Sequence, residues 1–357
     1  MASKRGPDSD GSLPPFPTGL KEAPITRISY SKIASKDATE CERLFLAVQE
    51  RSFFYLDFTH DDDLPPADNA ATSILTAATA LHDVAESAFG LPFEEKNAVS
   101  TFKTKSVFGF KAGGQTISKD PQRRVERVEF FNVAKDDIVA LSEGREPPTG
   151  IQYPAPLVSP REGLPYLSTF VRNAHPIGMK VLEILAAKLD MSYEDIAQRH
   201  RFNARSGDDA RFTYAPGLKE EGHEKLKDEE LPITTWEHTD YGSLTILFNW
   251  LGGLQIINRK TNEWEWVRPI PGCAICNIGD SMEVFTGGKL LSGVHRVLAA
   301  PGQQATLDRY SLVYFIRPED HVKMVDLTLS LEERKLQEAE AYGFTEWFYR
   351  KVLARIN

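Results

Sequence analysis

Residues 244–278 carry the pattern that decides the fold: LTILFNWLGGLQIINRKTNEWEWVRPIPGCAICNI. Short runs of β-branched and aromatic residues alternate here with turn residues, at Gly252-Gly253 and again at Pro271-Gly272. Closely spaced short strands separated by such turns are typical of an antiparallel sandwich or jelly roll. The same alternation of short apolar runs with turn residues extends over residues 205–320, so we expect the β-core there.

Helical periodicity surrounds this core on both sides. Before it, apolar spacing predicts helices over Ala38–Arg51, Ala70–Phe89 and Pro165–Leu189; after it, Ser330 and Glu333 predict a capping box that starts a helix. The expected fold class is therefore α+β with a mainly β core. We expect four regions: a flexible tail (1–23), an N-terminal helical and mixed region (24–204), the jelly-roll core (205–320), and C-terminal helices that pack on the core (321–357).

Composition excludes several classes of function. The chain has 357 residues and a formal net charge of −9, without a long basic run, so a nucleic-acid partner is not expected. No apolar stretch reaches the roughly 18 residues of a membrane span, and the first residues lack the apolar core of a signal peptide. Three cysteines cannot form a disulfide framework, which favours a reducing, cytoplasmic location. A monomer is the favoured oligomeric state.

Two histidines and one carboxylate have the spacing of a metal site. His238 and Asp240 are two residues apart, and on a strand such positions project to the same face. His295 lies on a later predicted strand and supplies a possible third ligand. Two imidazoles and a carboxylate form the facial triad of non-haem Fe(II) oxygenases, which leaves coordination positions open for a cosubstrate and O2.

A second pair, Arg309 and Ser311, shares a strand face in the same way. A guanidinium binds a carboxylate in a bidentate manner, and a serine hydroxyl adds a hydrogen bond. The pair therefore suits a dicarboxylate that chelates a metal at its other end. Taken alone, each feature has a plainer explanation: a His-X-Asp is common by chance, and a single arginine more often forms a surface ion pair.

Other candidate residues favour plain structural roles. Cys273 and Cys276 form a C-x-x-C on a predicted buried strand, where inert core cysteines are expected rather than a redox pair. The remaining histidines lack ligand spacing, and core or surface positions are expected for all six of them: His60, His82, His175, His200, His223 and His321.

At this point the sequence resembles a known family, the isopenicillin N synthase-like branch of the 2-oxoglutarate- and Fe(II)-dependent dioxygenases. The resemblance covers about residues 24–320. Its motifs occur in order along the chain: Arg51-Ser52-Phe53-Phe54-Tyr55-Leu56, Phe89-Gly90-Leu91-Pro92-Phe93-Glu94-Glu95-Lys96, Phe108-Gly109-Phe110, and the run Asn277-Ile278-Gly279-Asp280, Thr286-Gly287-Gly288, Ser292, His295-Arg296-Val297.

The resemblance implies a double-stranded β-helix flanked by helices. It implies that His238, Asp240 and His295 bind catalytic iron, and that Arg309 and Ser311 bind the distal carboxylate of 2-oxoglutarate. Relatives carry a Tyr directly before the Pro of an Asn-Tyr-Tyr-Pro segment; Ala215 stands there in this chain and Thr213 at the usual Asn. Tyr214 is the remaining candidate for that contact with the cosubstrate.

The implied activity is that of an Fe(II)- and 2-oxoglutarate-dependent dioxygenase acting on a small molecule, with secondary metabolism the favoured setting. It would consume O2, release succinate and CO2, and perform hydroxylation, desaturation or radical rearrangement, with ascorbate supportive in assays. Two alternatives stay open: a same-fold Fe(II) oxidase that does not use 2-oxoglutarate, and a non-catalytic jelly-roll binding protein. Four aromatic residues are candidates to line the substrate pocket: Phe108, Phe110, Phe285 and Phe315.

Overall fold

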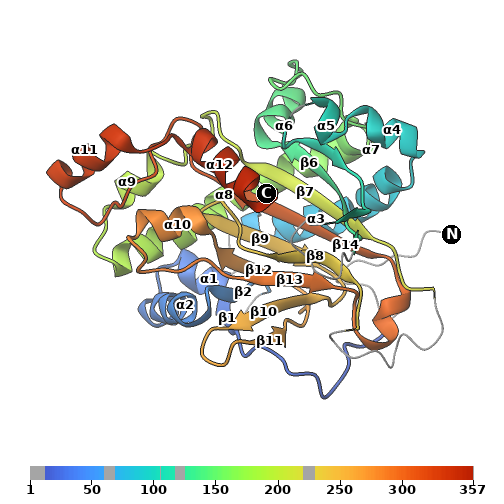
Figure 1. Ribbon diagram of the computed structural model, residues 1–357, viewed down its shortest axis with the longest axis horizontal. Coiled ribbons are helices and arrows are strands. Elements are labelled where there is room, and N and C mark those ends of the chain that lie inside the picture. The colour runs from blue at the N-terminus through green and yellow to red at the C-terminus, as the bar shows by residue number, and fades with distance from the viewer. Residues whose placement is uncertain (1–12, 60–68, 105, 117–124, 220–229, 357) are drawn as a thin grey trace.

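A computed structural model describes residues 13–59, 69–104, 106–116, 125–219 and 230–356 (Figure 1). Its largest element is an eight-stranded sheet, the major sheet, in the order β1-β2-β12-β9-β14-β7-β6-β3. All neighbouring strands in it run antiparallel except β1 and β2, which are parallel. The bounds of its strands are β1 Thr26–Ser29, β2 Phe53–Asp57, β3 Gly109–Lys111, β6 Glu129–Ala134, β7 Asp209–Ala215, β9 Leu244–Asn249, β12 Cys273–Ile278 and β14 Arg309–Ile316.

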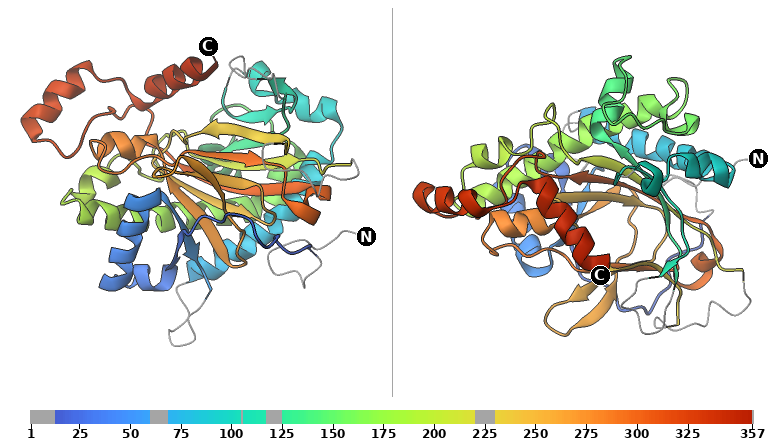
Figure 2. Two further views of the ribbon diagram at one scale, coloured as in Figure 1. Left: turned by 60° about the horizontal axis from the view of Figure 1, so that its bottom comes forward. Right: turned by 45° about the horizontal axis from the view of Figure 1, so that its top comes forward.

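A four-stranded antiparallel sheet, the minor sheet, faces the major sheet (Figures 1 and 2). Its order is β11-β10-β13-β8, and a separate hairpin pairs β4 with β5. The bounds of these strands are β4 Gln115–Thr116, β5 Val125–Glu126, β8 Ile233–His238, β10 Leu254–Asn258, β11 Glu263–Trp266 and β13 His295–Leu298. Four strands of the major sheet precede residue 205, so this sheet extends across the predicted boundary between the helical region and the core.

Helices cover the outer side of the major sheet and extend beyond its ends (Figure 2). The long helices α3 and α8 pack together and contact strands β9, β7 and β14. The helix bounds are α1 Tyr30–Ala34, α2 Ala38–Arg51, α3 Asn69–Phe89, α4 Phe93–Ala98, α5 Thr101–Thr104, α6 Lys135–Ser142, α7 Ala155–Val158, α8 Gly163–Lys188, α9 Tyr193–Ala197, α10 Asp280–Phe285, η2 Gly302–Thr306, α11 Leu331–Glu340 and α12 Phe344–Ile356. None of the helices in the described ranges combines the length and the apolarity needed to cross a bilayer.

Most predicted elements match this architecture to within a few residues. The helix over Ala38–Arg51 has the predicted bounds, and the capping box of Ser330 and Glu333 is present at the start of α11. The α+β class with a mainly β core is confirmed. Strands β3 and β6 were not predicted: β3 is only three residues long, and the adjacent Phe130 and Phe131 interrupt the alternation of polar and apolar residues in β6.

The predicted flexible tail needs revision for residues 13–23, whereas residues 1–12 lie outside the described residues. The chain at Lys21 and Ala23 exchanges backbone hydrogen bonds with Trp266 of β11, both 2.8 Å long. Phe16 is buried beside the same tryptophan in a small hydrophobic cluster. These contacts order residues that by composition resemble a linker.

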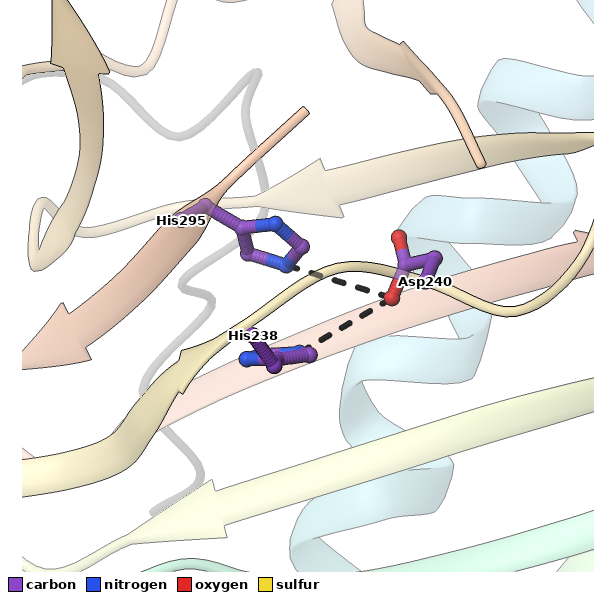
Figure 3. Close-up of side chains that lie close together, drawn as sticks. All are labelled: His238, Asp240 and His295. Carbon is purple, nitrogen blue, oxygen red and sulfur yellow. Dashed lines mark ion pairs between the residues drawn. The ribbon is translucent and has the colours of Figure 1, made fainter. Parts of the chain in front are cut away.

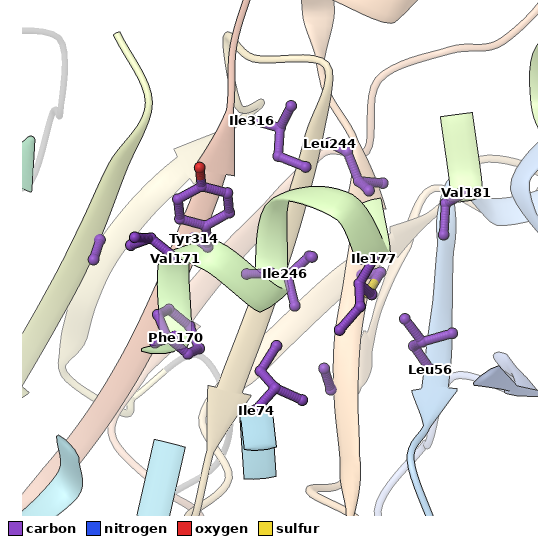
Figure 4. Close-up of a cluster of buried hydrophobic side chains, with 14 of the residues drawn as sticks. Leu56, Ile74, Phe170, Val171, Ile177, Val181, Leu244, Ile246, Tyr314 and Ile316 are labelled. Atoms are coloured by element: carbon purple, nitrogen blue, oxygen red, sulfur yellow. The ribbon is translucent and has the colours of Figure 1, made fainter. Parts of the chain in front are cut away.

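The main hydrophobic core lies between α8 and the major sheet (Figure 4). Figure 4 shows Ile177 of α8 beside Ile246, and Val181 of the same helix on the side of Leu244 and Leu56. The helix approaches closely at Gly178, where a Cβ atom would lie 2.1 Å from Cδ1 of Ile316 and 3.1 Å from Cδ2 of Leu244. A glycine is therefore required for this distance between helix and sheet.

Replacing Gly178 with valine is expected to destabilise the protein. The added methyl groups overlap the side chain of Ile316, and overpacking of this kind costs about 1–3 kcal/mol. Urea unfolding followed by circular dichroism measures the loss. Arg172→Val, at an exposed position of the same helix, is the control for the cost of a β-branched residue in a helix. Equal stability of the two variants would contradict the close approach.

Candidate metal centre

The structure brings His238, Asp240 and His295 together in a cavity that residues of both sheets line (Figure 3). The Nε2 atoms of His238 and His295 lie 3.8 and 3.9 Å from the same carboxylate oxygen, Oδ1 of Asp240. The possible ligand atoms all lie within 4.8 Å of one another. One metal ion placed among them would contact all three residues.

Two different local structures position these side chains. His295 begins β13 and stands directly opposite His238 on β8 in the antiparallel register. Asp240, however, lies two residues past the end of β8, so its placement does not follow from strand alternation as predicted. It is held in the turn between β8 and β9, where the amide of Asp280 donates to its backbone carbonyl over 2.7 Å.

Both imidazoles are oriented as metal ligands usually are. The Nδ1 atom of His238 lies 2.7 Å from the carbonyl oxygen of Trp236, and that of His295 lies 3.0 Å from the carbonyl of Gly293. A neutral ring that donates from Nδ1 carries its lone pair on Nε2, the atom that faces Asp240. Phe53 of β2 packs edge-on against His295, with ring centroids 5.7 Å apart, and limits its rotation.

Asp240 is buried and oriented by two hydrogen bonds. Thr245 Oγ1 and Asn277 Nδ2 donate to its Oδ2 atom over 2.7 and 2.9 Å, which leaves Oδ1 toward the histidines. Burial opposes ionisation of Asp240, but the charge that His295 and His238 carry when they are protonated, together with these hydrogen bonds, outweighs burial and lowers the pKa of Asp240 to about 2 in the metal-free site. The carboxylate is therefore charged at neutral pH. Two neutral imidazoles and one anionic oxygen form a donor set that fits Fe(II).

Arg309 and Ser311 line the same cavity from β14. Arg309 is only 5% exposed, and its Nε donates to the carbonyl of Gly252 over 2.7 Å. Gly253 has a φ of +117°, and a Cβ atom on it would lie 3.0 Å from that Nε, so a glycine makes room for the guanidinium. Burial lowers the pKa of Arg309 to about 10, and none of the described acidic residues forms an ion pair with it. Such a buried cation favours an anionic ligand.

Tyr214 does not face this cavity, which corrects the predicted contact with the cosubstrate. Alternation along β7 directs Arg211 and Thr213 into the cavity and Tyr214 to the opposite face, where it packs on Phe89 and Tyr310. Thr213 stands opposite Ser311, and their hydroxyl oxygens are 2.5 Å apart. Sequence reasoning missed Thr213 and Arg211 as residues of the cavity, although their spacing of two carried the signal.

The four aromatic candidates separate into three groups. Phe315 lines the cavity of the triad, as its position on the strand face of Ser311 predicted. Phe110 and Phe285 are fully buried in the main core and do not line it, which corrects their predicted role. Phe108 lines a different cavity of about 300 Å³, which helix α12 borders with Phe344 and Phe348. The prediction failed for Phe110 and Phe285 because aromatic residues near a barrel more often pack in the core against its covering helices.

The remaining histidines and the cysteine pair have structural surroundings. His175 and His200 are buried and hydrogen-bonded, and His321 is exposed; His60 and His223 lie outside the described residues. His82 lies near Asp83 and Glu86 on α3, with its ring packed edge-on against Trp250 and Tyr310. Cys273 and Cys276 are free thiols on β12, and burial raises the pKa of both, so neither is a thiolate at neutral pH.

His200 is expected to make stability depend on pH. It is 3% exposed, and its ring nitrogens contact the Ile196 carbonyl at 2.8 Å and the Ser243 hydroxyl at 2.7 Å. Burial lowers its pKa from 6.5 to about 4. As the pH falls, His200 therefore takes up a proton in the unfolded chain before it does so in the folded protein. The free energy of unfolding decreases as the pH falls from 6.5 toward 4, by up to about 3 kcal/mol.

Urea unfolding at pH 7.5 and pH 4.5 measures this loss. His200→Gln should show a smaller difference between the two pH values than the wild type, whereas His321→Gln, at an exposed position, should leave the difference unchanged. The same difference in wild type and His200→Gln would show that His200 does not carry the effect.

Comparisons with known proteins agree with this geometry. Residues 211–318, which contain the triad and Arg309, match the model of the 2OG-Fe(II) oxygenase superfamily. A 2-oxoglutarate-dependent dioxygenase of Aspergillus fumigatus is 28% identical over 331 residues, covering 88% of this chain and 80% of the relative. The dioxygenase frbH of a Dothideomycetidae species is 26% identical over 302 residues, covering 84% of each chain.

Among solved structures, a full-length Neurospora crassa protein in complex with alpha-KG superposes with a TM-score of 0.68 at 21% identity, over 92% of this chain and 95% of that one. The same Neurospora crassa protein has also been solved with thymine. This likeness confirms the predicted double-stranded β-helix.

Proposed function

We propose that this chain, which belongs to the 2OG-Fe(II) oxygenase superfamily, oxidises a small organic molecule of secondary metabolism and consumes 2-oxoglutarate and O2 in doing so. Fe(II) and 2-oxoglutarate are the cofactors of this superfamily. In this proposal His238, Asp240 and His295 hold the metal, and Arg309 with Ser311 binds the distal carboxylate of 2-oxoglutarate. The related fungal dioxygenases and the thymine complex of the Neurospora crassa protein support a small-molecule substrate.

The observation that carries the proposal is the placement of Arg309. A buried guanidinium without a carboxylate partner among the described residues lies in the same cavity as the triad. A dicarboxylate that chelates the metal through one end could reach this cation with the other. The hydroxyl pair of Ser311 and Thr213 adds a donor beside it. A non-catalytic binding protein would gain nothing from this combination of open metal positions and a carboxylate receptor.

The residues of the chain have distinct tasks in the reaction. His238, Asp240 and His295 would hold Fe(II), which would supply the activation of O2 at the coordination positions that a facial triad leaves open. Thr245 and Asn277 hold the Asp240 carboxylate so that a single oxygen faces the metal. Apolar side chains of both sheets, Leu247, Leu254, Val297 and Val313 among them, line the cavity and exclude water from the reacting centre.

Succinate release tests the proposal. The purified protein is incubated with Fe(II), 2-oxoglutarate and ascorbate, with and without a library of candidate small molecules. We expect slow succinate release that a true substrate accelerates. Oxidation of a substrate without loss of 2-oxoglutarate would instead favour a same-fold oxidase, and absence of both reactions under all conditions would contradict the proposal.

A further inference from the structure

A second arginine, Arg211, lines the cavity that holds the triad. It lies on β7, two residues before Thr213 and therefore on the same strand face. Its guanidinium carbon is 4.5 Å from the ring centroid of Phe130 and 4.7 Å from that of Phe315. The two phenyl rings are arranged around the guanidinium group and restrict its orientation.

The hydrogen-bonding capacity of this guanidinium is only partly used. Its Nε donates to Oδ1 of Asn132 over 2.7 Å, which fixes one edge. Among the residues that the structure describes, its two terminal nitrogens donate no hydrogen bond and it forms no ion pair. Asp209, two residues before it on β7, attracts Arg211 electrostatically, but its ion pair is with Arg317. The two terminal nitrogens of Arg211 form the edge of the guanidinium that can bind a carboxylate in a bidentate manner.

The charges in the cavity leave a place for one more anion. Arg309 serves the distal carboxylate of 2-oxoglutarate in the proposed function. When the Fe(II) ion, Asp240, both arginines and the 2-oxoglutarate dianion are counted together, one positive charge remains. The other surroundings of the cavity are largely apolar, with Leu247, Val297 and Val313 among the lining residues.

We propose that Arg211 binds a carboxylate of the substrate, and hence that the enzyme acts on organic acids with an apolar body. Phe130, Phe315 and Asn132 hold the guanidinium so that little rotamer freedom is lost when the acid binds. The inference rests on the proposed function, because it assigns Arg309 to the cosubstrate and Arg211 to the substrate. Arg211 would thereby determine which class of molecule is held beside the metal.

A matched pair of probes tests this assignment. The probes are 3-phenylpropanoate and its primary amide, which share an apolar body and differ in charge. Both are titrated by calorimetry into protein saturated with Mn(II) and 2-oxoglutarate, so that Arg309 and the metal are already occupied. We expect the acid to bind about tenfold or more tightly than the amide to the wild type, because only the carboxylate can accept two charge-assisted hydrogen bonds from the guanidinium.

Variants identify the residue responsible. Arg211→Gln should lose the preference for the acid while binding 2-oxoglutarate as the wild type does, and Arg211→Lys, which keeps the charge without the fork, should retain part of it. Arg172→Gln removes an exposed arginine that does not line the cavity, and this variant should retain the full preference for the acid. Melting temperatures check that each variant is folded.

Two results would overturn the inference. One is equal binding of acid and amide by the wild type; the other is a preference for the acid that does not follow Arg211, because it is unchanged in folded Arg211→Gln or completely lost in Arg172→Gln. Either result leaves the proposed function intact as long as the wild type binds 2-oxoglutarate. Failure of the wild type to bind 2-oxoglutarate in the presence of Mn(II) would overturn the proposed function, and the assignment of Arg211 with it.

Discussion

Asp240→Ala and His238→Ala are expected to abolish succinate release while the protein remains folded. Each variant removes one of three ligand atoms that lie within 4.8 Å of one another. Loss of a partner that merely orients a ligand already costs roughly 10–100-fold in metal affinity or activity, so loss of the ligand itself should cost more. Coupled measurements of succinate release and of Fe(II) bound per chain provide the test.

Glu237→Gln is the matched control for these variants. Glu237 lies between the two ligands in the sequence, but its side chain is exposed, so the change in charge should leave iron binding and turnover intact. Circular dichroism establishes that all three variants keep the fold. Iron-dependent turnover near the wild-type level in folded His238→Ala would remove this residue from the metal site.

Arg309→Ala is expected to weaken binding of 2-oxoglutarate by about 2–5 kcal/mol, which is roughly 30-fold to several thousand-fold in Kd. The loss is large because the guanidinium is buried. In the alanine variant, the distal carboxylate of 2-oxoglutarate would be buried without a countercharge. Calorimetric titration of 2-oxoglutarate in the presence of Mn(II) measures it. The number of metal ions bound per chain should not change, because Arg309 is not among the ligands.

Arg309→Lys separates charge from geometry. Lysine keeps the positive charge but lacks the rigid fork, so we expect affinity between those of the wild type and the alanine variant. A Kd for 2-oxoglutarate that is the same in wild type and Arg309→Ala would show that another group binds the distal carboxylate.

Strand alternation in the sequence correctly placed those residues of the site that lie within a regular strand, but not those that lie beyond a strand end. Arg309, Ser311 and Phe315 share a face of β14, and simple alternation was enough to place all three in the cavity. The same rule failed for Asp240, which lies beyond the end of its strand and depends on a turn held by Asp280. The triad was still identified because residue types and family resemblance compensated for the wrong local geometry.

Contacts between distant segments could not be predicted in this way. Whether Tyr214 or Thr213 faces the cavity depends on the register of β7 against β14, and one residue of shift exchanges the two faces. The stacking of Arg211 between Phe130 and Phe315 likewise requires three strands in their correct order. A single sequence specifies neither register nor strand order directly.

The attachment of residues 13–23 to β11 has a consequence for behaviour in concentrated solution. β11 is the last strand of the minor sheet, and such a strand offers unpaired backbone groups to any other extended chain. Hydrogen bonds between Trp266 and the backbone of Lys21 and Ala23 occupy part of this edge, and the Lys21 and Glu263 side chains add an ion pair beside it. On the opposite edge, Arg127 and Val128 donate to β8 in the same manner. The protein thus covers the borders of its smaller sheet with its own backbone and limits intermolecular strand pairing and aggregation.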